Sequence, residues 1–332
     1  MQFNEYRGRS VLITGGAGFI GSNLARRLAE LGGVQVHVLD ALLPDGGGNL
    51  HNLHEVRECV SLHTGDLRDE AVVAPLVEAA DVVFNLAAAV GHVDSVRRPL
   101  HDLELNCAAQ LALLNACRAH NPRVKVVYTS TRQVYGRSLY LPLDEQHPVA
   151  PRDVNGIHKL AAEQYHLLYG RLYGLRPVCL RLTNTYGPRQ YVRDDSQGVL
   201  GWFIRQAVEG GTLELFGDGG QWRDLNYVDD VVEALLLAGA SEAAEGETFN
   251  LGGDAPVTLR EVAETLISLT GCGSVRHVPF PPERDLIDIG NSHSSYRKIE
   301  AALGWRPRTP LHEGLARTIE FYRGYGAHYW PR

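Results

Sequence analysis

The chain has 332 residues, of which 44% are hydrophobic and 21% charged, and its formal net charge is −7. This is the composition of a globular protein, so collagen-like and disordered chains are excluded, and the negative charge argues against a broad nucleic-acid-binding surface. Only three of the 32 basic side chains are lysines, namely Lys125, Lys159 and Lys298. A lysine kept among so many arginines is a candidate for a place that needs a compact ammonium.

The sequence gives no sign of export or of a membrane segment. Residues 1–10 are polar and lead directly into a predicted strand, so no signal peptide is expected. No apolar run reaches the length of about 18 residues that a membrane helix requires. The five cysteines include no Cys-x-x-Cys pair, which argues against a disulfide framework and a zinc site. We therefore expect a cytoplasmic protein without a metal centre.

The first half of the chain alternates strands with helices. Apolar and β-branched runs predict strands at 10–14, 34–39, 60–63, 81–86, 124–129 and 178–182. Helical spacing of apolar residues predicts helices at 23–31, 71–80, 102–120 and 156–173. The strand at 81–86 is almost continuously apolar, as in a parallel sheet that is buried on both faces. These features predict an α/β fold with a Rossmann-type, doubly wound parallel sheet.

After Thr183, glycines and prolines separate shorter elements, and helices are predicted at 228–239, 259–269 and 311–322. We therefore predict two units. Residues 1–183 form a dinucleotide-binding domain, to which residues 225–255 return. Residues 184–332 form a smaller α/β lobe that binds the substrate.

The segment TGGAGFIG (14–21) connects the first strand to the first helix and places glycines at positions 15, 18 and 21. Gly15 allows a sharp turn, Gly18 lets the backbone approach a pyrophosphate, and Gly21 lets the helix pack against the strand. The amino-terminal end of the helix then faces the phosphate groups. The strand–loop–helix context predicts a dinucleotide site.

Two aspartates extend this prediction. Asp40 ends the second strand, where a carboxylate accepts hydrogen bonds from a ribose 2′-hydroxyl and repels a 2′-phosphate, so NAD is favoured over NADP. Asp66 follows the third strand, where it either reaches the adenine amino group or caps the next element.

Six short motifs and one aspartate occur in an order along the chain that, taken together, indicates a protein family. They are TGGAGFIG (14–21), Asp40, GDLRD (65–69), NLAA (85–88), STRQVYG (130–136), RLTNTYGPR (181–189) and RDLNYVDD (223–230). Together they resemble the NAD-dependent nucleotide-sugar epimerases and dehydratases of the extended short-chain dehydrogenase/reductase family. The resemblance covers nearly the whole chain, and the ordered set is far more specific than any single motif.

The resemblance implies a Rossmann domain that holds NAD and a C-terminal lobe that binds a nucleoside-diphosphate sugar. It also implies a homodimer packed through helices near 102–120 and 156–173. Besides the three glycines and two aspartates, the motif positions implied to contact NAD are Phe19, Ile20, Leu67, Ala87 and Lys159.

The catalytic positions of the family are only partly kept. Thr131 occupies the position of the catalytic Ser or Thr, whose hydroxyl hydrogen-bonds the reacting sugar oxygen. Lys159 occupies the lysine position of the Tyr-x-x-x-Lys pair, where the ammonium binds nicotinamide ribose and lowers the pKa of a neighbouring acid. The tyrosine of this pair is replaced by Asn155, whose amide is no general base near neutral pH.

Three explanations of Asn155 remain open. Another residue supplies the base, or Lys159 itself acts as the base once it is desolvated, or the protein binds its ligands without catalysis. The titratable candidates for the base are Tyr135, Tyr140, His92 and His158. His158 lies one helical step from Lys159 and is expected to face solvent.

The residues after Thr131 narrow the choice among the reactions that the family catalyses. Dehydratases of the family carry Asp-Glu there and decarboxylases carry a Glu nearby, whereas this chain has Arg132 and Gln133. Epimerisation needs neither carboxylate, so the sequence favours an NAD-dependent epimerase acting at C4 of a UDP- or dTDP-hexose. The alternatives are a nucleotide-sugar dehydratase or reductase with an unusual base, and a non-catalytic protein that binds NAD or a nucleotide sugar.

The resemblance also implies a set of substrate contacts. Asn184 matches an asparagine near the diphosphate, and Phe216 matches an aromatic residue that lies on the nucleotide base. Arg223 and Arg284 match two arginines that hold the diphosphate, which guanidinium groups bind well. Ser95 is a further candidate contact to the sugar.

Overall fold

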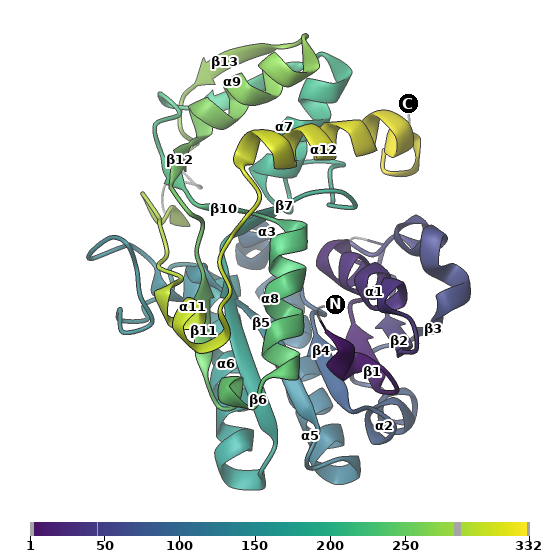
Figure 1. The fold of residues 1–332 in the computed structure, drawn as a ribbon. Coiled ribbons are helices and arrows are strands. Elements are labelled where there is room, and N and C mark those ends of the chain that lie inside the picture. The colour runs from purple at the N-terminus through teal and green to yellow at the C-terminus, as the bar shows by residue number, and fades with distance from the viewer. Residues whose placement is uncertain (1–2, 45, 282–286, 331–332) are drawn as a thin grey trace.

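The computed structural model describes residues 3–44, 46–281 and 287–330. Its centre is a sheet of seven parallel strands in the order β11-β6-β5-β4-β1-β2-β3 (Figure 1). The strands are β1 (Ser10–Thr14), β2 (Gln35–Asp40), β3 (Val60–Thr64), β4 (Val82–Asn85), β5 (Lys125–Thr131), β6 (Arg176–Leu182) and β11 (Thr248–Leu251). The predicted doubly wound parallel sheet is confirmed.

Helices cover both faces of this sheet. On one face α1 (Phe19–Leu31) packs against α8 (Val228–Ala240), and α8 also contacts β4, β5 and β6. On the other face lie α2 (Glu70–Glu78), α5 (Ala109–His120) and α6 (Val154–Tyr173), which contact one another in that order. Each helix layer buries its own apolar cluster against the sheet. Because both faces are covered, the central strands β4, β5 and β6 are buried along almost their whole length.

The order of the strands reverses direction at β1. From β1 the chain proceeds to β2 and β3 on one side, and it then returns to build β4, β5 and β6 on the other. The loops that follow β1 and β4 therefore diverge at the carboxyl ends of these strands. In open α/β sheets this switch point is where ligands bind.

As far as the structure describes it, the second half of the chain adds three two-stranded sheets and, besides α8, four α-helices, which lie mostly at the top of Figure 1. The sheets pair β7 (Asn184–Tyr186) with β10 (Leu225–Tyr227), β8 (Thr212–Phe216) with β13 (Ser274–Val278), and β9 (Trp222–Arg223) with β12 (Val257–Thr258). The helices are α7 (Val199–Glu209), α9 (Leu259–Thr270), α11 (Arg297–Leu303) and α12 (Leu311–Tyr325). Since α8 and β11 belong to the central layers, residues 228–251 lie with the first half. The division of function between 1–183 and 184–332 stays a prediction.

The helix predicted at 102–120 differs from the structure. It consists of α4 (Pro99–Leu103), a π-helical segment η3 (Glu104–Ala108) and α5. The wider turn of η3 places the buried side chain of Asn106 on the backbone of Ala89, where the amide accepts from the N–H at 3.2 Å and donates to the C=O at 3.0 Å. Apolar spacing carries no signal for such a segment, which is common beside functional sites.

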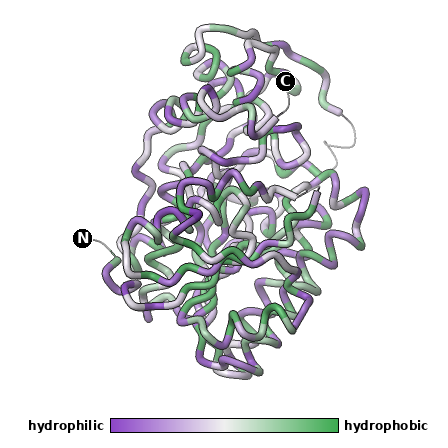
Figure 2. Tube along the Cα trace, turned by 90° about the vertical axis from the view of Figure 1, so that its right-hand side faces the viewer, coloured by the Kyte–Doolittle hydropathy of each residue, from purple (hydrophilic) through white to green (hydrophobic). Residues whose placement is uncertain are grey.

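Short helical elements that the sequence did not predict complete the fold. They are η1 (Asn4–Tyr6), η2 (Leu50–Cys59), α3 (His92–Arg97), η4 (Arg132–Tyr135), η5 (Glu242–Ala244) and η6 (Gly326–His328). Figure 2 shows hydrophobic stretches running through the molecule and hydrophilic ones interleaved with them. Within the described ranges, no helix combines the length and the apolar character needed to cross a membrane.

Candidate active site

A cavity of about 560 Å³ opens at the switch point, a volume typical of ligand-binding pockets. One wall consists of residues that follow β1, β2, β4 and β5, and the opposite wall comes from α7, β8 and residues 287–289. The predicted site residues that line it are Gly15, Gly18, Phe19, Ile20, Gly21, Asp40, Asp66, Leu67, Ala87, Thr131, Asn155, Lys159, Asn184, Phe216 and Arg223. Arg284 lies outside the described residues.

The glycines after β1 form a cradle that larger residues would fill. Gly15 has a φ of +67°, and a Cβ there would lie 2.8 Å from the backbone of Ala87. A Cβ at Gly21 would lie 2.4 Å from the carbonyl oxygen of Gly15. Gly18 is the N-cap of α1 and has no side chain to occupy the first N–H groups of the helix. This end of the helix fits the pyrophosphate of a dinucleotide.

Asp40 lies at the end of β2, and its carboxylate is held in place by backbone groups. Oδ2 accepts from the N–H of Ala17 at 3.0 Å, and Oδ1 accepts from the N–H of Leu42 at 2.9 Å. Burial raises the pKa of Asp40, although these two hydrogen bonds act in the opposite direction. A carboxylate fixed at this edge of the cavity fits the ribose hydroxyls of NAD.

Asp66 binds a neighbouring side chain. Both of its oxygens accept from Arg68, at 2.7 and 3.0 Å, and Arg68 also donates to Glu104 at 3.1 Å. The hydrogen bond from Arg68 lowers the pKa of Asp66. The side chain that caps α2 is that of Asp69, which accepts from the N–H of Ala71. Asp66 and Leu67 thus line the cavity without capping the helix.

Thr131 and Lys159 both line the cavity. Thr131 ends β5, and its Oγ1 accepts from the N–H of Gln133 at 3.3 Å, which leaves the hydroxyl hydrogen to donate elsewhere. Nζ of Lys159 donates to the carbonyl oxygen of Thr129 at 2.6 Å and lies 4.6 Å from the centre of the Tyr128 ring. Burial lowers the pKa of Lys159 to about 8, against the opposing effect of nearby carboxylates.

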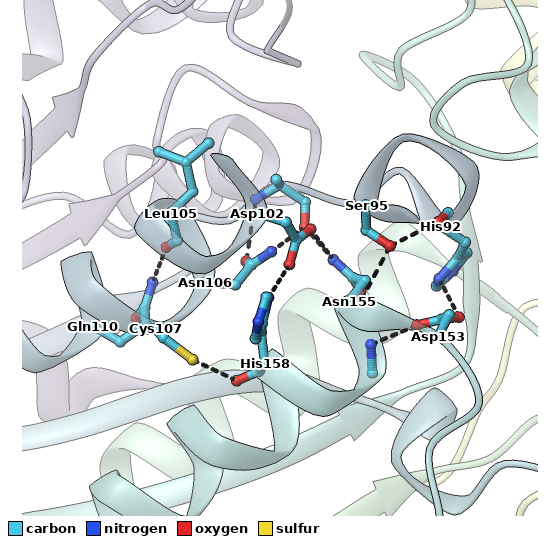
Figure 3. A network of polar contacts seen from close by, with 12 residues as sticks. His92, Ser95, Asp102, Leu105, Asn106, Cys107, Gln110, Asp153, Asn155 and His158 are labelled. Carbon is cyan, nitrogen blue, oxygen red and sulfur yellow. Dashed lines mark hydrogen bonds and ion pairs between the residues drawn. The ribbon is translucent and has the colours of Figure 1, made fainter. Parts of the chain in front are cut away.

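Asn155 is held by a polar network behind the cavity (Figure 3). Its Nδ2 donates to the carbonyl oxygen of Ala89 at 2.8 Å and to Oδ2 of Asp102 at 3.1 Å. Oδ1 of Asp102 lies 2.6 Å from Nδ1 of His158. The expectation that His158 faces solvent is wrong. Its side chain is only 14% exposed, because α4 and η3 cover this side of α6 and bring the buried Asp102 against the imidazole.

Ser95 is not among the residues that line the cavity. It is buried in α3, and its hydroxyl donates to the carbonyl oxygen of His92 at 2.7 Å and accepts from the N–H of Asn155 at 3.2 Å. Because these contacts use both functions of the hydroxyl, the structure places Ser95 as a link between α3 and α6. It does not bring this side chain to the sugar position predicted from the sequence.

Of the four titratable candidates for the base, His92 alone lines the cavity. The hydroxyl of Tyr135 is buried, where it donates to Asn250 and accepts from Arg181. The hydroxyl of Tyr140 donates to Asp144 on an exposed loop. His158 faces Asp102 in the network behind Asn155. The ionisable residues of α3, α6 and the N-cap of α6 that line the cavity are His92, Asp153 and Lys159.

The substrate side of the cavity carries two arginines. Arg132 is buried, and its Nε and Nη2 donate to Oδ1 of Asn184 at 3.2 and 2.7 Å. Nη1 of Arg132 has no hydrogen-bond partner among the described residues. Burial and the charge of Arg223 lower the pKa of Arg132 to about 10. An unpaired buried N–H of a cation is a site for an anionic ligand.

Arg223 and Phe216, the predicted contacts to the diphosphate and the base, both line the cavity, and each also has a protein partner. Nη2 of Arg223 lies 3.1 Å from Oδ1 of Asp288, and its Nη1 donates to the carbonyl oxygen of Gly290. The ring of Phe216 packs against that of Phe280, with 5.4 Å between the ring centres. The sequence alone does not indicate a role in the site for Asp153 or Asp288, or a binding role for Arg132. Asp153 has a recognisable N-cap pattern before α6, whereas the other two become notable only through contacts distant in sequence.

Comparisons with known proteins agree with this geometry. Residues 11–252 match the model of the NAD dependent epimerase/dehydratase family. A UDP-glucose 4-epimerase of Mycolicibacterium smegmatis is 35% identical over 316 residues, which span 94% of this chain and 98% of that protein. A dTDP-glucose 4,6-dehydratase of Streptomyces niveus is 32% identical, over 97% of this chain and 95% of that protein. The structure of an epimerase from Methanothermobacter thermautotrophicus superposes with a TM-score of 0.90 at 30% identity, covering 98% of this chain and 95% of that one.

Proposed function

The chain belongs to the NAD-dependent epimerase/dehydratase family, and from this premise we propose that it is an epimerase of a nucleoside-diphosphate sugar that acts at C4 of a UDP- or dTDP-hexose. The observation that carries the proposal is the set of groups next to Thr131. The threonine hydroxyl and the Lys159 ammonium share the cavity, while Arg132 and Gln133 follow Thr131 where the dehydratases carry carboxylates. Proton removal and return at one hydroxyl need no second acid, so epimerisation fits these groups.

The residues of the glycine cradle would hold the dinucleotide, with its pyrophosphate at the first turn of α1 and its ribose near Asp40. When bound, NAD would supply the acceptor and the donor for the hydride of the sugar carbon. Thr131 donates its hydroxyl hydrogen to the reacting sugar oxygen and orients it. Lys159 supplies a positive charge close to this oxygen, which favours the loss of its proton.

The remaining contacts fix the nucleoside diphosphate. Arg132 and Arg223 present guanidinium groups to the phosphate oxygens, together with Asn184 and with Arg284, which the sequence motif implies. Phe216 offers a flat ring to the nucleotide base. These contacts hold the phosphates and the base while the sugar remains free to turn, and the turning of the keto-sugar is what epimerisation requires.

The test is the incubation of purified protein with UDP-, dTDP-, GDP- and CDP-hexoses, followed by NMR of the sugar protons. We expect the interconversion of C4 epimers of one UDP- or dTDP-hexose. Water loss would instead support the nucleotide-sugar dehydratase alternative, and a net redox change would support the reductase. If NAD and a nucleotide sugar bind but no sugar is converted, the protein is a binding protein, a role that the amide of Asn155 would allow.

We also propose a cytoplasmic homodimer, packed through the helices of residues 99–120 and 154–173. Apolar side chains are exposed on these helices, which is typical of a surface that a partner covers. They are Leu100, Leu103, Ile157, Leu168 and Leu172, with Leu100 73% and Leu172 60% exposed. Light scattering of the purified protein should give twice the mass of the chain. The double variant Leu100→Glu, Leu172→Glu should give the mass of one chain, because each dimer would bury four unpaired carboxylates.

A further inference from the structure

His92 and Asp153 form a histidine–carboxylate pair at the edge of the cavity (Figure 3). Nδ1 of His92 lies 3.0 Å from Oδ2 of Asp153, within ion-pair distance, and it has no hydrogen bond of good geometry to any of the described residues. The imidazole is 36% exposed and the carboxylate only 2% exposed, so the pair runs from the protein interior to the ligand space. The residues come from α3 and from the N-cap of α6, and 60 residues separate them in the sequence.

The contact of Nε2, the other ring nitrogen, defines the tautomer of the imidazole that this arrangement favours. Nε2 of His92 lies 3.2 Å from Nε2 of Gln133, whose amide group is a donor. Nε2 of the imidazole is therefore the acceptor, and the ring proton is on Nδ1, the nitrogen that lies nearer to Asp153. A neutral imidazole with its lone pair directed away from the carboxylate is the form that a general base requires.

Asp153 is fixed in its place. Its Oδ1 accepts from the N–H of Gly156 at 2.6 Å and caps α6. Burial raises the pKa of Asp153, but the contact with His92, the hydrogen bond from Gly156 and the charge of Arg132 outweigh this effect and leave the pKa below its ordinary value. A carboxylate that stays ionised in this position orients the imidazole and stabilises the cation formed when His92 takes a proton.

We propose that His92, positioned by Asp153, is the base that removes the proton of the reacting sugar hydroxyl, in place of the phenol that is missing at position 155. This inference rests on the proposed function. The O–H bond breaks and its proton forms a bond to Nε2, while the electron pair left on oxygen forms the carbonyl. The hydride on the same carbon is taken up by oxidised nicotinamide dinucleotide. The reverse transfers, on the other face of the keto-sugar, restore the imidazole and the dinucleotide.

The groups around Asn155 support this assignment over the other bases. The amide group of Asn155 donates its hydrogens to Ala89 and Asp102, so this side chain has a structural role and takes no proton from the substrate. Nζ of Lys159 donates one hydrogen to the carbonyl oxygen of Thr129. The ammonium would also have to lose its proton, and with it its positive charge, before it could act as a base. His92 reaches the same cavity with a free acceptor once a sugar hydroxyl displaces the amide of Gln133.

The first test is kinetic and compares three variants. His92→Gln keeps a polar side chain without a basic nitrogen. Asp153→Asn keeps an oxygen for the N–H of Gly156 but removes the negative charge. His120→Gln is the matched control, since it changes a second, similarly exposed histidine beside a carboxylate, Glu70, outside the cavity. Each is mixed with the converted nucleotide sugar in a single turnover, and the absorbance of reduced nicotinamide and the sugar isomers are recorded.

We expect nicotinamide reduction to slow by about 100-fold or more in His92→Gln, the usual contribution of a general base. Asp153→Asn should slow it at least about tenfold, because an amide holds the imidazole in the wrong tautomer. His120→Gln should stay within about twofold, as a change away from the reacting groups should. Reduction at the wild-type rate in His92→Gln would overturn the inference.

The second test does not depend on turnover. Protein labelled with ¹⁵N-histidine, compared with His92→Gln, assigns the ring nitrogens of His92 by NMR. We expect a proton on Nδ1 and none on Nε2 in the wild type, and a shift toward the opposite tautomer in Asp153→Asn. A wild-type His92 that is protonated on Nε2 would contradict the proposed base. If Asp153 were merely a helix cap, Asp153→Asn would leave the ring signals unchanged.

The outcomes separate this inference from the proposed function. Nicotinamide reduction without isomer formation would reject the epimerase, and the comparison of His92→Gln with the wild type would still decide the role of His92. Isomer formation that persists in His92→Gln would reject the inference and keep the epimerase. A wild type that neither reduces its nicotinamide nor converts a sugar would reject both.

Discussion

Lys159 is buried and has a pKa of about 8, so its charge changes within the working range of an enzyme. The ammonium is protonated below about pH 8 and neutral above it. We expect kcat to fall as the pH rises through about 8, because Lys159 acts through its positive charge in the proposed function. The measurement is kcat for the converted sugar between pH 6 and 9.5. A rise of kcat through the same range would identify Lys159 as the base and contradict the role of His92.

The size of the ammonium matters as well as its charge. Lys159→Arg keeps the charge, but the larger guanidinium does not fit between Thr129 and the Tyr128 ring in the same position. We expect kcat to fall on the order of 100-fold, the typical effect of removing one group that stabilises charge in a reaction. The NAD content of the variant, measured after denaturation, distinguishes this loss from a loss of the cofactor. Unchanged turnover would remove Lys159 from the mechanism.

Arg132 has a buried Nη1 without a hydrogen-bond partner among the described residues. If the nucleotide sugar supplies that partner, Arg132→Gln should raise KM by about 10- to 100-fold, since a hydrogen bond to a charged group contributes about 1.5–3 kcal/mol. Arg27→Gln, on the exposed face of α1, is the control and should leave KM unchanged. A KM that does not change in Arg132→Gln would show that Arg132 serves only to position Asn184.

The positions of some residues of the candidate site could be predicted from the sequence, and those of others could not. The glycine cradle was predictable, because a strand–loop–helix segment fixes the positions of Gly15, Gly18 and Gly21 locally. The pair of His92 and Asp153 was not, because it depends on how α3 packs against the first turn of α6. Ser95 was misplaced for the same reason, since its hydroxyl lies between these two helices and not in the cavity. Contacts between distant segments leave no periodic signal in one sequence.

At the scale of elements, the π-helical segment η3 joins α4 to α5 and contacts the loop after β4, on the side of the cavity that is proposed to hold NAD. Asn106→Leu should lower the free energy of unfolding by about 1–3 kcal/mol, because the buried N–H of Ala89 loses its acceptor. It should also weaken NAD binding, since residues 87–89 line the cavity. Urea unfolding and NAD titration measure the two effects. Asn115→Leu, at an exposed position on α5, should change stability by no more than about 0.5 kcal/mol. Equal effects of both variants would argue against a special role of η3.

The elements of the first half were predicted to within a few residues, and those of the second half less completely. The strand at 10–14 was predictable from its continuous apolar run, and the helix at 156–173 from apolar residues at helical spacing. The segments β8 and β13, which form a parallel pair, were missed although β8 alternates buried and half-buried residues. A five-residue strand paired with a partner about 60 residues away is too short for its pattern to be distinctive.

At the scale of the whole molecule, the central sheet and one of its helix layers meet in a polar cluster at the end of β4. Asn85 donates to Gln110 of α5 at 2.7 Å and lies 3.2 Å from Nε2 of His166 on α6. His166 is completely buried, stacks on Tyr128, and has Nδ1 2.8 Å from the carbonyl oxygen of Ala162. Nδ1 is therefore the donor and Nε2 the acceptor, so a second ring proton would face the N–H of Asn85.

This arrangement predicts how acid affects the stability of the fold. Burial lowers the pKa of His166 to about 4, from 6.5 in the unfolded chain. Between these two values only the unfolded state binds the proton, so the free energy of unfolding falls as the pH falls. The total loss is about 3 kcal/mol, complete near pH 4. Buried carboxyl groups whose pKa is raised, such as Asp40 and Asp224, act in the opposite direction.

The difference between variant and wild type isolates the contribution of His166. His166→Gln keeps one donor and one acceptor for Ala162 and Asn85 but does not titrate. Urea unfolding at pH 7, 6, 5 and 4 should show the wild type losing about 3 kcal/mol more than the variant over this range. His120→Gln, on the partly exposed end of α5, should follow the wild type. Parallel losses in wild type and His166→Gln would mean that His166 takes up its proton in the folded state, and that the polar cluster at β4 opens to water without unfolding of the sheet.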